Sequence, residues 1–244
     1  MRLFPTSRRL AAPLFAAAIL VGTTGAAAAE AMDDDLFLKI VADELEYRVQ
    51  DGSDLLTWEG MAHLGNDDHA VALKTRGAYE LDHDAFENAE FQLLYQRPVD
   101  DFFDLQAGIR HDIRPHPART FAVLGLTGLA PQWIEFDAST FLSERGYLSA
   151  RLEVEYDILL TQRLILQPSA ELALALSDDR ETGVGAGLVS LEAGLRLRYE
   201  ITRDVAPYVG VNWERRFGET ARFVRAEGGD PNELAGVFGI RLSY

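Results

Sequence analysis

The strongest constraint on the fold is an alternation of apolar and polar residues between Gly146 and Leu176. In Leu148–Ile158 every second residue is apolar, and most residues between them are charged. This is the period of a β-strand with two different faces. A second alternating arm begins at Leu164, after the short turn Leu159–Gln162. Each arm exceeds the ~5–6 residues of a typical soluble strand and reaches the ~9–11 residues that cross a membrane. A long hairpin of a soluble sheet would share this local pattern, so its repetition along the chain decides between the two.

The pattern does repeat. Twelve segments with a period of two follow one another, and they are Leu38–Val49, Leu55–Leu64, Ala70–Tyr79, Ala89–Tyr95, Phe103–Asp112, Thr120–Ala130, Ile134–Ser139, Leu148–Ile158, Leu164–Leu174, Leu191–Glu200, Tyr208–Glu214 and Leu234–Tyr244. An even number of strands joined as a meander is typical of bacterial outer-membrane barrels. We therefore expect an all-β, antiparallel meander barrel of about 12 strands over residues 38–244, located in the cell outer membrane and in contact with its lipid.

The connections between these segments support the barrel. Leu159–Gln162 and Thr202–Ala206 are short, whereas Ser177–Ser190 and Gly218–Glu233 are long. Outer-membrane barrels have short periplasmic turns and long extracellular loops, which matches this alternation if the N-terminus is periplasmic. A soluble sandwich predicts no such asymmetry, and its dry core would hold charges such as that of Arg196 only at a heavy desolvation cost. Pro168 lies inside one segment, where we expect a β-bulge.

The first residues have the composition of a cleaved secretory signal. A basic start with Arg2, Arg8 and Arg9 precedes a 12-residue apolar run, Leu10–Val21, and small residues that end at Ala29. This order is typical of a signal peptide, and the run is too short for a membrane-spanning helix. We therefore expect a signal peptide over residues 1–29 and a short acidic periplasmic lead-in over residues 30–37.

Charge and composition limit the possible partners. The expected signal peptide holds three of the 23 basic residues, so 39 acidic residues face 20 basic ones in the rest of the chain. This excess of negative charge argues against nucleic acid, whose phosphates require a basic surface. It suits cations or a charged, water-filled interior. The chain has no cysteine, so disulfides and thiolate chemistry are excluded.

Several long stretches of the sequence are familiar, and they are DLQAGIRHDIRP (Asp104–Pro115), GLAP (Gly128–Pro131), LEVEYDILLTQRLILQP (Leu152–Pro168), LEAGLRLRYEI (Leu191–Ile201) and APYVGVNWER (Ala206–Arg215). With them the chain resembles the copper resistance protein B family of outer-membrane barrels from about Asp43 to Tyr244. The resemblance implies that the barrel handles copper ions, by binding or passage across the outer membrane, in a copper resistance or homeostasis system beside periplasmic copper proteins. Members often carry a Met- and His-rich segment before the barrel. Here that region is short, with Met32 as its only soft ligand.

Four residues are candidate copper ligands. Glu59, Met61 and His63 alternate along one strand on the face expected to be inward, and they combine a carboxylate, a thioether and an imidazole. Such ligands suit Cu(I) or Cu(II). The three span about 13 Å along a strand, so they need help from neighbours to share one ion. His63 as a simple polar lumen residue is the competing interpretation. His111 is the fourth candidate, although the alternation aims it at lipid unless the strand end bulges.

A second set is expected to form a charge network in the lumen, and its members are Arg110, Asp112, Arg151, Glu153, Glu155, Asp157, Arg196 and Arg198. The network would brace the barrel or select cations. No serine pairs with a histidine by its spacing, so we expect no enzymatic activity. Besides a barrel that binds or passes copper, the sequence leaves open a non-conducting structural barrel that docks a periplasmic copper protein.

Overall fold

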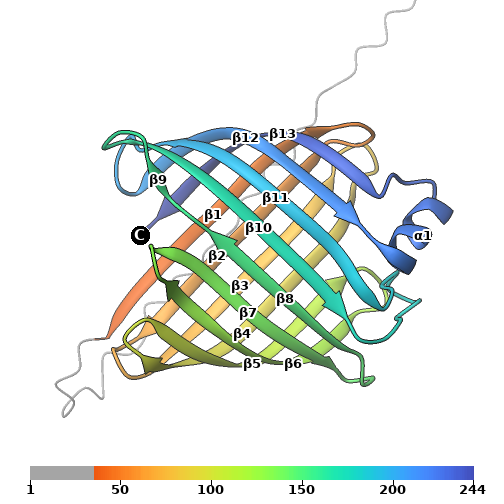
Figure 1. Cartoon of the computed structure of the whole chain (residues 1–244), viewed down its shortest axis with the longest axis horizontal. Helices are drawn as coiled ribbons and strands as arrows, with labels where there is room; N and C mark the ends of the chain where they lie inside the picture. Colours follow the sequence, from red (N-terminus) through yellow and green to blue (C-terminus); the bar gives the residue numbers. More distant parts are fainter. Residues whose placement is uncertain (1–35) are drawn as a thin grey trace, which may run out of the picture. The chain divides into compact units, whose positions relative to one another are not determined.

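The computed structural model describes residues 36–244, in which one antiparallel sheet closes into a barrel (Figure 1). The expected signal peptide and residues 30–35 of the lead-in lie outside the described residues. The strands of this part are β1 (Phe37–Gln50), β2 (Leu55–Gly65), β3 (Ala70–Glu80), β4 (Ala85–Asp100), β5 (Phe103–Arg114), β6 (Arg119–Ala130), β7 (Ile134–Ser143), β8 (Leu148–Glu155), β9 (Ile158–Leu159), β10 (Leu164–Ala175), β11 (Gly187–Tyr199), β12 (Val205–Arg216) and β13 (Asn232–Ser243).

Strands that follow one another in the chain are paired, except β8 and β9, and the pairing of β13 with β1 closes the ring. β10 pairs with β8, β9 and β11. β9 is a two-residue continuation of β8, because both pair with β10 in one unbroken register. The described part of the chain therefore forms a twelve-stranded barrel when β8 and β9 are counted as one strand. This confirms the predicted fold class and strand number.

Pro168 does not cause the expected bulge. Its strand, β10, keeps its register with β11 through Pro168↔Leu195 and shifts only between Ala173 and Leu174. The effect appears on the other neighbour, since the break between β8 and β9 falls opposite Pro168. Tyr156 N donates to Pro168 O at 3.1 Å, but proline has no N–H for the reciprocal bond. One missing ladder bond thus interrupts the strand without adding a residue to it.

The two faces of the wall are opposite in character to those of a water-soluble protein. On β11, Leu195 and Leu197 are exposed on the outer face while Arg196 and Arg198 are buried inside. β4 shows the same inversion between Glu90 and Gln96, with the apolar Leu94 as the one exception on its inner face. An apolar outer surface and a polar interior are the arrangement of a barrel that lies in lipid.

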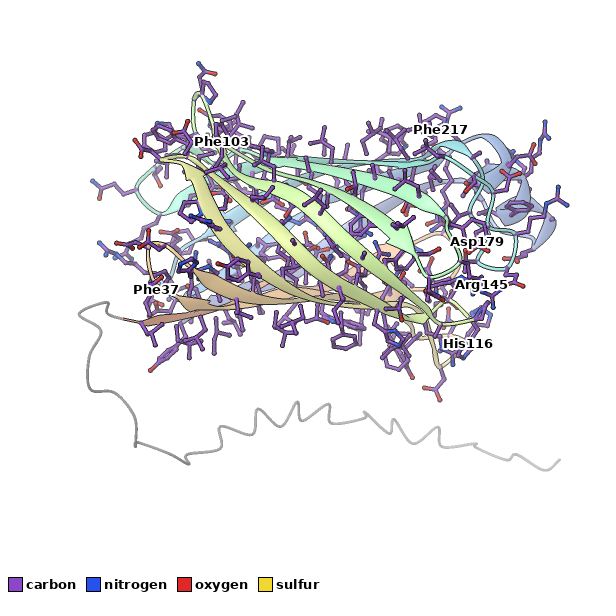
Figure 2. The ribbon with its side chains drawn as sticks, turned by 90° about the horizontal axis from the view of Figure 1, so that it is seen from below. Phe37, Phe103, His116, Arg145, Asp179 and Phe217 are labelled. Carbon is purple, nitrogen blue, oxygen red and sulfur yellow. The ribbon has the colours of Figure 1, made fainter. Side chains whose placement is uncertain are left out.

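The two ends of the barrel differ. At one end, which we call the turn end, β1 begins and the connections have two to five residues. At the other, the loop end, residues 176–186 and 217–231 form connections of 11 and 15 residues. The helix α1 (Gly218–Ala226), which the sequence pattern did not predict, lies in the longer loop. Figure 2 shows Phe37 at the turn end and Phe217, Asp179 and Arg145 at the loop end. Within residues 36–244, no helix is long and apolar enough to cross a membrane.

Candidate functional site in the barrel lumen

Strand register arranges the inward side chains in rows. One row runs Glu59↔Arg76↔Glu90 across β2, β3 and β4 and continues to Asp112 on β5. Because facing residues in a ladder lie about 5 Å apart, Arg76 lies between two carboxyl groups in this row. The alternation seen in single strands therefore becomes a belt of charge along the inside of these four strands.

Arg76 connects this belt to the opposite side of the lumen through ion pairs. Its guanidinium lies 2.9 Å from the carboxylate of Glu59, 2.6 Å from that of Glu153 and 2.7 Å from that of Glu171. β3, which holds Arg76, and β10, which holds Glu171, are six strands apart in either direction around the twelve-strand ring. The Arg76–Glu171 ion pair thus joins opposite walls and narrows the interior.

Glu90 is a second centre of the same network. Its carboxylate lies 2.8 Å from Arg110 and 3.0 Å from Arg151. Arg110 also binds Asp112 at 2.7 Å, and Arg151 reaches Glu171 at 3.4 Å. Because every carboxylate here faces at least one guanidinium, the charges compensate one another inside the barrel.

A separate network lies on the β1 and β11 side. Arg196 binds Glu44 at 2.5 Å and Glu46 at 2.6 Å, while Arg48 binds Glu46 at 2.9 Å and Glu192 at 3.2 Å. Glu46 is only 2% exposed, so its two arginine partners are needed to hold its charge there.

The residues predicted for the charge network all take part in inward-facing polar contacts. Arg198 binds Asp157 at 2.6 Å, and Glu155 accepts a hydrogen bond from Gln167 at 3.0 Å. Seven further residues belong to these networks and were not predicted from the sequence: Glu44, Glu46, Arg48, Arg76, Glu90, Glu171 and Glu192. All seven lie on the polar face of an alternating strand, which is the signal that could have found them.

An open cavity runs beside these networks. It has a volume of about 330 Å³, and eleven carboxylates and seven arginines line it. Water occupies about 30 Å³ per molecule in the liquid, so the cavity has room for several waters or a hydrated cation. Acidic side chains therefore outnumber arginines by four along this lining, a composition that suits cations better than anions.

A small apolar cluster also lies on the inner wall, where β3, β4, β6 and β7 each contribute one buried side chain. Ala72, Leu94, Val123 and Phe141 form a buried cluster, and Met61 and Phe121 pack against it. The guanidinium of Arg110 lies 4.6 Å from the centre of the Phe141 ring, close enough for a cation–π contact. This contact joins the apolar cluster to the charge network.

The candidate copper ligands are placed differently from one another. Glu59 is held by Arg76, and Met61 packs against the apolar cluster. The ring of His63 lies 5.4 Å from that of Phe37, near the turn end. His111 lies on the outer face, where its Nδ1 is 2.9 Å from the hydroxyl of Thr120. The barrel wall therefore separates His111 from the inward three. Among residues 36–244, no three His, Asp or Glu side chains are grouped so as to hold a metal ion.

At the loop end, one of the long loops is fixed to the barrel. The guanidinium of Arg119, at the start of β6, binds Asp179 at 3.0 Å and Glu181 at 2.6 Å. Glu181 also binds Arg145 at 2.8 Å, and Figure 2 labels Asp179 and Arg145 at this end. Burial alone would raise the pKa of the Asp179 carboxyl, but the hydrogen bonds and charge of Arg119 outweigh it and hold that pKa below its usual value.

An apolar outer surface, a charged interior and a closed ring of twelve antiparallel strands define an outer-membrane β-barrel. The solved structure of the NanC porin has the same fold, with a TM-score of 0.54 at 14% identity over 84% of this chain and 99% of that chain. The family described as copper resistance protein B precursor matches residues 36–244. The copper resistance protein B of Escherichia coli is 40% identical over 205 residues, which cover 84% of this chain and 69% of that protein. A homologue from Pseudomonas syringae pv. tomato shows the same identity and coverage. The chain belongs to the copper resistance protein B family, which confirms the resemblance, and it is an outer-membrane protein.

Proposed function

We propose that this barrel passes copper ions across the outer membrane through its lumen. The observation that carries the proposal is the cavity of about 330 Å³ with a surplus of four carboxylates inside a barrel of a copper resistance family. A negative, partly desolvated channel raises the local concentration of cations and lowers the barrier to their entry. The proposed cargo is the copper ion itself, and the proposal assigns the chain no catalytic role.

Arg76 is the proposed barrier in the path. A copper ion that reaches Glu153 and Glu171 meets carboxylates that already bind this guanidinium at 2.6 and 2.7 Å. A Cu(II) ion can compete with the guanidinium for these oxygens, because it has the higher charge. Passage then consists of a transient exchange of partners, after which the guanidinium binds the same carboxylates again.

Met61 and His63 are the proposed soft ligands at the turn-end side of this barrier. Both are on β2 and two residues apart, so they project from the same face about 7 Å from each other. A thioether and an imidazole retain copper better than Ca²⁺ or Mg²⁺, which prefer oxygen. We propose that this pair selects copper after the carboxylates have concentrated cations in general.

A non-conducting barrel that anchors a periplasmic copper protein is the second candidate. The observation in its favour is that several ion pairs cross the lumen, among them Arg76–Glu171 and Arg76–Glu153, and Arg216–Glu87 at a distance of 3.1 Å. In this alternative the networks act only as braces, and copper is handled by the docked partner.

Flux measurements separate the two candidates. Liposomes containing the purified barrel and a copper-sensitive dye are exposed to Cu(II), to Cu(I) under reducing conditions, and to Mg²⁺. We expect copper entry at rates well above those of empty liposomes and above those for Mg²⁺. A correctly folded barrel that shows no copper entry under either condition would contradict passage and support the anchor.

A further inference from the structure

A second hollow lies outside the lumen, at the loop end, between α1 and the adjoining ends of β12 and β13. It has a volume of about 500 Å³, and four arginines and one aspartate line it: Arg215, Arg216, Arg222, Arg225 and Asp230. Figure 1 shows α1 beyond the end of the barrel, beside these two strands. A basic pocket is unexpected in a chain with 39 acidic and 23 basic residues.

The helix presents its basic side to the hollow. Gly218, Ala221, Arg222 and Arg225 all line it, and their spacing of three, four and seven residues places them on one helical face. The opposite side is fixed to the neighbouring long loop, where Gly185 N donates to the buried Thr220 hydroxyl at 2.9 Å. The arginines are thus carried by an element with a defined position.

Two of the four arginines have no carboxylate partner. Arg216 binds Glu214 and Glu87, and Arg222 binds only Glu219, in an exposed contact of the kind that contributes little. Within residues 36–244, Arg215 and Arg225 form no ion pair. The guanidinium of Arg215 lies 5.4 Å from the Phe217 ring, and that of Arg225 donates to a backbone carbonyl. Their charges are therefore available to an anion.

The position of the hollow indicates where such an anion comes from. Val211, Trp213 and Arg215 alternate along the outward face of β12, so Arg215 follows the tryptophan on the lipid side of the wall. The Trp213 indole donates to Asn232 at 3.0 Å. Tryptophan at the end of a spanning strand marks the boundary between hydrocarbon and headgroups. With the short turns in the periplasm, this boundary belongs to the outer leaflet.

We infer that this hollow binds the phosphate groups of a phosphorylated glycolipid headgroup in the outer leaflet. A guanidinium has a planar fork of donors that matches phosphate oxygens in bidentate fashion. Arg215 approaches from the wall and Arg225 from the helix, so one phosphate placed between them receives donors from both sides. The lipid would hold α1 at the membrane boundary, next to the mouth of the lumen.

The test measures lipid binding to the full-length barrel in detergent by native mass spectrometry. The probes are a bisphosphorylated diglucosamine lipid, the same lipid after enzymatic dephosphorylation, and inorganic phosphate. We expect the phosphorylated lipid to bind about tenfold more tightly than the dephosphorylated one. The double variant Arg215→Gln/Arg225→Gln should lose this preference. Arg180→Gln, an exposed arginine of the other long loop that does not line the hollow, is the matched control and should keep it.

Three results would overturn the inference: equal affinity for the two lipids, an unchanged preference in the double variant, or complete displacement of the lipid by an equal concentration of inorganic phosphate. The last result would assign the pocket to free phosphate. Heat-dependent gel mobility shows whether each variant is folded. If the double variant does not fold, the single variants carry the same test, each with a loss of roughly threefold.

Discussion

Two parts of the barrel interior are filled by different kinds of side chain. Around the cluster of Ala72, Leu94, Val123 and Phe141 the space is filled by apolar side chains, with Leu94 and Phe141 almost completely buried. Most of the remaining interior holds polar and charged side chains, and carboxylates and arginines among them line a cavity of about 330 Å³. Close-packed apolar groups have one arrangement, whereas ion pairs near water can exchange partners. We therefore expect the apolar part to support the wall and the charged part to carry the proposed function.

The largest effect is expected on the apolar side. Phe141→Ala should lower the free energy of unfolding by about 4 kcal/mol, because it removes a buried ring and leaves a void. It also removes the cation–π contact with Arg110 at 4.6 Å. Urea titration of the barrel in detergent measures the change. The control is Leu142→Ala, since Leu142 is 49% exposed on the outer face. Equal losses for the two variants would contradict a supporting role for the inner cluster.

On the charged side, Arg76→Met should cost less stability and change transport more. The variant leaves Glu59, Glu153 and Glu171 without their shared partner, and we expect a loss of about 3 kcal/mol for a partly hydrated network. Removing the barrier should also raise copper flux into liposomes. Arg203→Met, an exposed arginine at the turn end, serves as control for the loss of one positive charge. A folded Arg76→Met barrel with wild-type flux would show that Arg76 only braces the wall.

The long loop 176–186 offers a smaller and pH-dependent effect. Asp179 has a lowered pKa in the folded protein because of Arg119. Its contribution to stability is therefore complete above the unfolded pKa of about 3.9 and is lost as the pH falls through the lower folded value. Asp179→Asn should lower the free energy needed to open this loop by about 2 kcal/mol at neutral pH.

Hydrogen exchange of residues 176–186 at pH 7 and at the lowest pH where the barrel stays folded measures this effect. The wild-type loop should be better protected at pH 7, whereas the variant should show little difference between the two once intrinsic exchange rates are corrected. Arg180→Gln, in the same loop, should exchange like the wild type. A wild-type loop whose protection does not change with pH would exclude Asp179 as its fastening group.

The features that could be predicted from sequence are those that depend on one strand alone. Alternation along single strands suffices for the barrel, its twelve strands and the face of most side chains, as for Arg196 inside and Leu195 outside. It fails where the outcome depends on a partner strand. Pro168 was expected to bulge its own strand, but the break appears in the strand opposite. The helix α1 was missed because nine residues in a loop show no strand period.

The candidate site, too, could be predicted from single strands only in part. The sequence indicates that Arg151 and Glu153 face inward, but it does not show that Arg76 reaches Glu171, because that contact needs ring closure and the tilt of the strands. Partners across a barrel are distant in sequence and have no spacing rule. Sequence therefore predicts the composition of the lumen wall, and the structure adds which charges compensate one another.

The smallest effect on stability is expected at His63. This residue also tests whether the apolar and the charged part of the interior both contribute to copper binding. Its register partner is Ala72 of the apolar cluster, and Glu59, four residues earlier, belongs to the charged belt. If Met61 and His63 select copper, His63→Ala should reduce copper affinity about tenfold and change unfolding by less than about 1 kcal/mol.

Copper titration of the purified barrel under reducing and oxidising conditions measures this change, and His111→Ala is the matched control. His111 lies on the outer face, so its removal should leave affinity unaltered. If the two variants bind copper equally well, His63 is a polar wall residue and selection must come from the carboxylates alone. The apolar part of the interior would then contribute only to stability, and the charged part alone would bind copper. A loss confined to His63→Ala would instead place the selective step at the border between the two parts.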